Sequence, residues 1–197
     1  MSQTFRSIIL FGPPGCGKGT QGRMLQAVSG HLHISSGEIF RALPPESELG
    51  KLYHSYMDEG KLGPDDLTIK IFCEHMESLA RDKIYKPGEQ ILLLDGIPRT
   101  EPQVELLAPH IDLLSVLVFD MGNKDALIER LKKRAAIEGR NDDQSSHILD
   151  NRMEVFYNQT LPALSALPEG KIIHIDATQK PLIVLRDVLD RIGTLIS

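Results

Sequence analysis

Short apolar runs alternate along the chain with longer segments in which apolar residues recur every three or four positions. Four runs stand out, at residues 7–11, 90–95, 113–119 and 171–175, and a shorter one lies at residues 32–34. Their apolar residues are largely continuous rather than alternating, which is typical of strands covered on both faces of a parallel sheet. We therefore expect these runs to form strands.

The segments between the runs carry helical stripes of apolar residues. These stripes comprise Met24, Leu25 and Val28; Leu67, Ile71, Phe72, Met76 and Leu79; Leu127 and Leu131; and Leu182, Leu185, Leu189 and Ile192, which come after Pro181 at an expected first helical turn. Strands that alternate with helices indicate an α/β fold with a doubly wound parallel sheet. Ligands of such sheets bind outside the carboxyl ends of the strands, so residues just after strand ends are the first candidates for a site.

Two segments depart from this alternation. Residues 35–64 contain no strong strand and are expected to form helices set apart from the sheet. Residues 134–143 are polar and charged and include Gly139, so they are expected to form a short surface loop between two helices.

Composition narrows the class of protein. With 197 residues, 41% of them hydrophobic, the chain is expected to form one globular domain, residues 1–197. A net charge of −5 argues against a nucleic-acid partner, although a local cluster of arginines and lysines can still bind phosphate. Cys16 and Cys73 form no C-x-x-C pair, so neither a disulfide nor a cysteine-ligated zinc is expected. Without a secretory core, a membrane span or an evident large apolar patch, we expect a cytoplasmic monomer.

The first run leads into a glycine-rich loop, residues 12–20, with the sequence GPPGCGKGT. It fits the pattern G-x-x-x-x-G-K, except that the hydroxyl residue, Thr20, comes one position later than usual. Glycines allow successive backbone N–H groups to point at one anion, and the helix after the loop favours negative charge at its N-terminus. Lys18 would add a positive charge, and Cys16 is interpreted as a spacer. The alternative is an ordinary turn before a helix, with a surface lysine.

The second long run ends in Asp95. A carboxylate that closes an apolar strand beside a phosphate-binding loop is a common second element of a magnesium site, here expected to act with Thr20 and to reach the ion through water. Many strands end in aspartate, so Asp95 indicates a magnesium site only in combination with the glycine-rich loop.

Four motifs in order resemble those of the nucleoside-monophosphate kinase family, and of adenylate kinases in particular. They are GCGKGT at residues 15–20, HISSG at 33–37 with Arg41 shortly after it, DGIPRT at 95–100, and RNDD at 140–143. The resemblance implies a P-loop three-layer α/β fold, a parallel sheet flanked by helices, with a helical monophosphate-binding segment at residues 35–64 and a short, zinc-free lid at residues 134–143. It implies reversible phosphoryl transfer from Mg-ATP to AMP, giving two ADP.

The same resemblance implies roles for individual residues. ATP would be bound by Gly15, Cys16, Gly17, Lys18, Gly19, Thr20, Arg134 and Gln179. AMP would be bound by Ser36, Arg41, Lys61, Leu62, Gly63, Gly96, Arg99, Gln103, Arg140 and Arg152. The catalytic cations would be Lys18, Arg99, Arg134, Arg140 and Arg152. Elementary chemistry agrees, because phosphoryl transfer needs alignment and positive charge on the equatorial oxygens, whereas solvated helix charges are the alternative for these arginines.

Gln103 bears on the choice of base. A glutamine amide donates and accepts at once, which matches an adenine edge.

Three features depart from the family pattern. Gly63 replaces a frequent valine, so one wall of the adenine pocket is expected to be open; Ser36 replaces a frequent threonine; and the spacing from Asp143 to Arg152 is one residue longer, which within a helix would rotate the later residues by about 100°.

Two other functions remain open. A UMP or CMP kinase could be built on the same scaffold. A nucleotide-binding regulator without turnover would be expected to lack Lys18 or the arginine set, and this chain has both.

Overall fold

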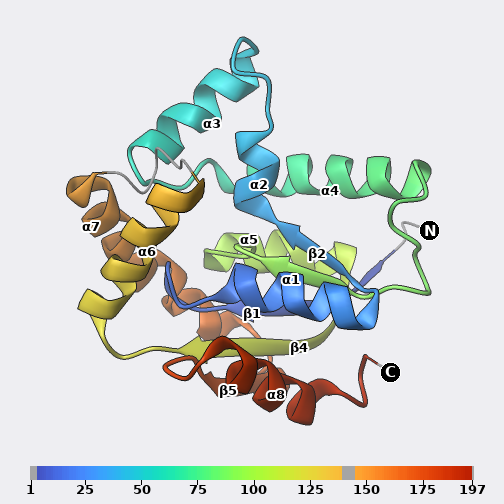
Figure 1. Ribbon diagram of the computed structural model, residues 1–197. Helices are drawn as coiled ribbons and strands as arrows, with labels where there is room; N and C mark the ends of the chain where they lie inside the picture. The colour runs from blue at the N-terminus through green and yellow to red at the C-terminus, as the bar shows by residue number, and fades with distance from the viewer. Residues whose placement is uncertain (1–3, 139–144, 197) are drawn as a thin grey trace.

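The computed structural model describes residues 4–138 and 145–196. In these residues a parallel sheet of five strands forms the centre of the molecule (Figure 1). Its strands are β1 (Phe5–Phe11), β2 (Leu32–Ser35), β3 (Leu92–Asp95), β4 (Ile111–Asp120) and β5 (Ile172–Asp176), in the order β2-β3-β1-β4-β5. Each matches one of the expected apolar runs, and the α/β fold with a parallel sheet is confirmed.

Helices cover both faces of the sheet, which makes three layers. One face packs on α4 (Asp65–Arg81) and α5 (Glu101–Leu107), and the other on α1 (Lys18–Ser29), α6 (Lys124–Glu138) and α8 (Pro181–Ile192). Neighbouring strand residues divide between the two cores: Ile9 and Leu94 join the α4 side, whereas Ile8 and Leu93 join the α1 side. Continuous apolar runs are therefore required, because every position in the strand centre faces a helix.

The remaining elements are short or stand at the rim of the sheet. Figure 1 shows α3 (Glu48–Asp58) away from the sheet, whereas α2 (Ser36–Arg41) follows β2 directly. Ile39 and Phe40 of α2 belong to the same core as the strand residues on the α4 side, so only α3 stands apart as expected. Helix α7 (Ser146–Val155) continues into a π-helical turn, Phe156–Thr160, which is followed by two short 3₁₀-helices, Pro162–Ala166 and Glu169–Lys171. Another short 3₁₀-helix, Ala108–His110, comes after α5. None of the helices in the described ranges is both long and apolar enough to cross a bilayer.

Three sequence expectations need correction. Val28 and Leu182 lie on the expected helices but point outward, with 64% and 69% of their surface exposed. The third concerns residues 134–143, because α6 continues to Glu138 and Arg134 is helical rather than part of a loop. Ala135 is buried against the core, and alanine favours helix, which explains the longer helix.

Candidate active site

A cleft of about 540 Å³ opens at the carboxyl ends of the strands. The loop after β1, the end of β3 and residues of α6 and α7 line it. This is the position at which a doubly wound sheet binds ligands, because the loops that leave neighbouring strands converge there. Every residue of the loop from Gly15 to Thr20 is part of the lining.

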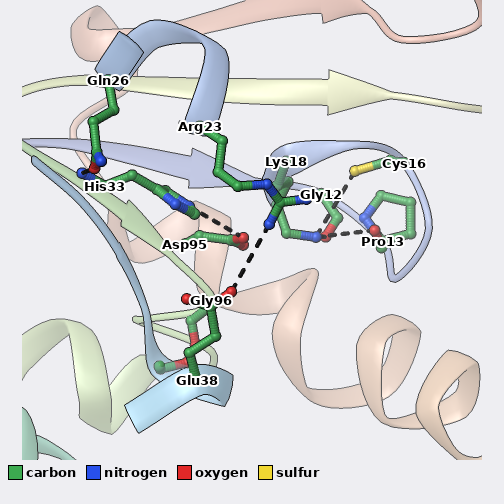
Figure 2. A network of polar contacts seen from close by, with 11 residues as sticks. Gly12, Pro13, Cys16, Lys18, Arg23, Gln26, His33, Glu38, Asp95 and Gly96 are labelled. Atoms are coloured by element: carbon green, nitrogen blue, oxygen red, sulfur yellow. Dashed lines mark hydrogen bonds and ion pairs between the residues drawn. The ribbon is translucent and has the colours of Figure 1, made fainter. Parts of the chain in front are cut away.

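The glycine-rich loop folds as its sequence predicts. Gly15 and Gly17 have positive φ angles of 84° and 107°, and α1 begins at the next residue, Lys18. The Lys18 ammonium donates hydrogen bonds to the carbonyl oxygens of Gly12, at 2.7 Å, and Pro13, at 3.0 Å (Figure 2). The lysine therefore bridges its own loop beside the N-terminus of α1, where an anion is favoured.

Cys16 occupies the interior of this loop. Its side chain is buried, with Sγ 3.8 Å from the Lys18 ammonium. Burial raises the pKa of the thiol and outweighs the opposing effect of Lys18. A protonated, buried thiol is a poor nucleophile, which supports the interpretation of Cys16 as a spacer.

Asp95, at the end of β3, faces His33 of β2. The carboxylate lies 3.6 Å from His33 Nε2, as Figure 2 shows. Burial works to raise the pKa of Asp95, but His33 and the positive charges of Lys18 and Arg99 lower it below its usual value. Asp95 is therefore ionised at neutral pH. Gly22 makes the approach of His33 possible, since any Cβ there would come within 2.2 Å of the imidazole.

The donor set on this side of the cleft fits a magnesium ion bound together with phosphates. Thr20 is exposed in the cleft and Asp95 supplies an ionised carboxylate. Magnesium keeps several waters and takes one or two carboxylates plus substrate oxygens, so it does not need a dedicated cage. The described residues accordingly contain no group of three or more metal-ligating side chains.

The strand-end motif gathers two side chains on one carbonyl oxygen. Ser36 Oγ and Arg99 Nε each donate to the oxygen of Gly96 at 2.7 Å. Gly96 has a φ of 82°, and a Cβ there would lie 2.7 Å from both side chains. Ser36 is buried beneath the pocket rather than lining it, so its hydroxyl positions Gly96 and does not face the cleft.

A second, smaller pocket adjoins the cleft and shares Arg41, Arg99 and Arg152 with it. Lys61, Leu62, Gly63, Gly96 and Gln103, which were all expected to bind AMP, also line it. The extra residue before Arg152 has not turned that arginine away, since α7 is continuous and presents Arg152 to both pockets.

The expected open wall at Gly63 is wrong. Tyr53 Cε1 would lie 2.7 Å from a Cβ at this position, so the tyrosine ring takes the space of the missing side chain. Tyr53 stacks on Phe40 at 4.5 Å and its hydroxyl bonds Thr68 Oγ1 at 3.0 Å. From the sequence, Gly63 indicated only that a side chain is absent at this position. Nothing in the neighbouring sequence indicated that the Tyr53 ring fills the space.

Gln103 is 2% exposed, and both atoms of its amide have partners. Its Oε1 accepts from the backbone N–H of Arg99 at 2.7 Å, and its Nε2 donates to Asp65 Oδ1 at 2.8 Å. The glutamine is thus fixed in the pocket wall by neighbours that the sequence did not identify as its partners.

The cleft brings together more cations than the sequence indicated. The expected Arg134 and Arg152 line it, and so do Arg23, Arg130 and Lys133. Arg130 lies one helical turn before Arg134, so the four-residue spacing could have identified it. Arg23 pairs with Glu38 at 3.8 Å across the cleft, a contact between α1 and α2 that no local pattern predicts (Figure 2).

Gln179 also lies in the lining, in the turn after β5. Its Nε2 donates to Asp187 Oδ2 at 2.8 Å. Arg140, Asp142 and Asp143 lie outside the described residues.

Comparison with known proteins agrees with this geometry. The family model described as adenylate kinase matches residues 10–170. An adenylate kinase of Corynebacterium urealyticum is 37% identical over 175 residues, covering 86% of this chain and 90% of the relative. An adenylate kinase of Porphyromonas gingivalis is 35% identical, with 85% of each chain covered. One of Phocaeicola vulgatus is 37% identical, with 86% of this chain and 88% of the relative covered.

Proposed function

The chain belongs to the adenylate kinase family and transfers a phosphoryl group from ATP to AMP, and on this premise we propose how its residues divide the work. ATP binds in the large cleft over the glycine-rich loop, and AMP binds in the adjoining pocket. The observation that carries this proposal is the shared boundary of the two pockets, which contains Arg41, Arg99 and Arg152. A phosphoryl group between two such sites would pass along a path lined by positive charge.

On the ATP side, the backbone N–H groups of residues 15–20 cradle the phosphates at the N-terminus of α1. When ATP binds, the Lys18 ammonium gives up its hydrogen bonds to the carbonyl oxygens of Gly12 and Pro13 and donates to phosphate oxygens instead. Arg134 and Gln179 hold the rest of the nucleotide, in keeping with their positions in the cleft lining.

Magnesium would be held by Thr20 and, through water, by Asp95. When bound, it would neutralise negative charge on the phosphates. Asp95 contributes a carboxylate that stays ionised at neutral pH, because its pKa lies below the usual value.

On the AMP side, Arg41 and Arg99 bind the phosphate as planar forks. The backbone at Lys61, Leu62 and Gly63 borders the adenine, and the amide of Gln103 forms hydrogen bonds with the edge of the base. Ser36 contributes indirectly: its hydroxyl and Arg99 both hold the Gly96 carbonyl, so Ser36 fixes the strand end that presents Arg99.

Catalysis depends on alignment and charge rather than on covalent chemistry. Lys18, Arg99, Arg134, Arg140 and Arg152 stabilise the phosphoryl group in transit. The monophosphate-binding segment at 35–64 and the short lid at 134–143 close over the nucleotides and exclude water, whose attack would hydrolyse ATP. We further propose that the protein acts as a cytoplasmic monomer without a nucleic-acid partner.

The test of this proposal is a coupled assay of ADP formation from ATP with AMP, CMP, UMP or GMP as acceptor. AMP is expected to give the highest kcat/KM. In Gln103→Leu, the loss of paired hydrogen bonds costs about 1–3 kcal/mol for each polar group left unsatisfied, and the preference for AMP should decline with it. Faster phosphorylation of UMP or CMP by the unaltered protein would instead support a pyrimidine-nucleotide kinase.

A further inference from the structure

The amide of Gln103 can take only one orientation in its pocket. Arg99 presents a backbone N–H, which only donates, and Asp65 presents a carboxylate, which accepts. Exchanging the amide oxygen and nitrogen would place Oε1 against the carboxylate oxygen and Nε2 against the N–H. Both hydrogen bonds would be lost in a side chain that is 2% exposed, so the exchanged orientation is strongly disfavoured.

Asp65 is itself held firmly. It is the first residue of α4, and the hydroxyl of Thr100 donates to the same Oδ1 at 2.9 Å. Thr100 in turn caps α5, accepting from the backbone N–H of Gln103 at 3.2 Å. Asp65 therefore joins the N-termini of α4 and α5, and it comes two positions after the pocket residues 61–63.

The locked amide keeps one N–H on Nε2 and one lone pair on Oε1 for a ligand. A 6-aminopurine offers the matching pair, an amino group that donates and a ring nitrogen that accepts. A 6-oxopurine offers the reverse, a carbonyl that accepts and a ring N–H that donates. Only the exchanged orientation of the amide would suit the second type of base.

We propose that Asp65 is a positioning residue that selects 6-aminopurine over 6-oxopurine acceptors by locking the amide of Gln103. This rests on the proposed function, in which Gln103 reads the acceptor base. Asp65 does not touch the nucleotide; it determines which atom of Gln103 donates. A site arranged in this way rejects the wrong base because its buried polar groups would be left unpaired.

The test compares AMP with IMP, which replaces the 6-amino group by an oxygen and carries a proton on the adjacent ring nitrogen. In Asp65→Asn the new amide can donate as well as accept, so it can pair with either orientation of Gln103. Only the backbone N–H of Arg99 then still opposes the orientation that suits IMP, and the penalty for binding IMP becomes smaller. The ratio of kcat/KM for AMP to that for IMP is expected to fall about tenfold, as for one hydrogen bond to a charged group. Asp65→Ala, which offers no partner, is expected to lower the ratio similarly.

Asp66→Asn is the matched control, because it removes the same charge from the next, exposed residue of α4. Its AMP-to-IMP ratio should match that of the unaltered protein. Unchanged ratios in both Asp65 variants, with folding verified by circular dichroism and the KM for ATP retained, would overturn the inference. So would an equal fall in Asp66→Asn, which would indicate a general effect of charge. Equal use of AMP and IMP by the unaltered protein would instead refute the proposed role of Gln103.

Discussion

At the scale of single residues, Lys18 is held by groups that a nucleotide would replace. Its ammonium bonds two carbonyl oxygens of its own loop, and the side chain is only half-buried. Such bonds order the lysine without placing it in a core. Its removal should therefore affect the chemistry far more than the fold.

We predict that Lys18→Ala reduces ADP formation to the background of the assay, because no other group of the loop supplies positive charge at that point. The thermal unfolding midpoint should stay close to that of the unaltered protein. Lys51→Ala, which alters an exposed lysine of α3, serves as the control and should keep full activity. A Lys18→Ala variant with a sizeable fraction of the original kcat would refute the assignment of the loop.

Single residues also mark the limit of what the sequence predicted about the site. Lys18, Asp95 and Arg99 lie at or just after strand ends, so the fold itself brings them toward one another. Tyr53 against Gly63, and Asp65 against Gln103, are contacts between separate helices and loops. Their partners depend on how α3, α4 and α5 pack, which no local spacing encodes.

At the scale of elements, α1 shows how an apolar stripe divides between core and solvent. Leu25 is fully buried, whereas Val28, three residues later on the same expected face, is 64% exposed. The apolar stripe of α1 predicted that a helix forms here and roughly which of its faces packs against the core. It could not predict the edge of the buried face, because that edge depends on where α8 and β2 meet the helix.

These two positions make a matched pair for a stability measurement. Leu25→Ala should lower the free energy of unfolding by about 2–5 kcal/mol, through lost burial and a residual cavity. Val28→Ala should change it by less than about 0.5 kcal/mol, as for most surface substitutions. Urea unfolding of both variants gives the comparison; similar losses at the two positions would contradict the described packing of α1.

The elements themselves were largely predictable. All five strands and the main helices correspond to continuous apolar runs and three-to-four spacing, since a sheet covered on both faces requires that pattern. The end of α6 was not predictable in this way. The last turns of α6 carry charged residues, as a surface loop would. Only the burial of Ala135, which the sequence does not show, distinguishes this part of the helix from a loop.

At the scale of the whole molecule, the sheet brings the ends of three strands to one cleft. The glycine-rich loop after β1, Asp95 at the end of β3 and Ser35 at the end of β2 all face the same cleft, because the strands are parallel and adjacent. We propose that ATP in this cleft and AMP in the adjoining pocket are bound at the same time, with Arg99 and Arg152 between them.

The most direct test is titration with a molecule in which two adenosines are joined by a chain of five phosphates, so that one ligand spans both subsites. We predict that one molecule binds per chain and displaces ATP and AMP together. Because it combines both ligands near their reacting geometry, its Kd should lie below that of either nucleotide by on the order of 10²-fold or more. Binding of two molecules per chain, or displacement of ATP while AMP stays bound, would contradict the proposal that the two nucleotides bind side by side in the cleft and the adjoining pocket.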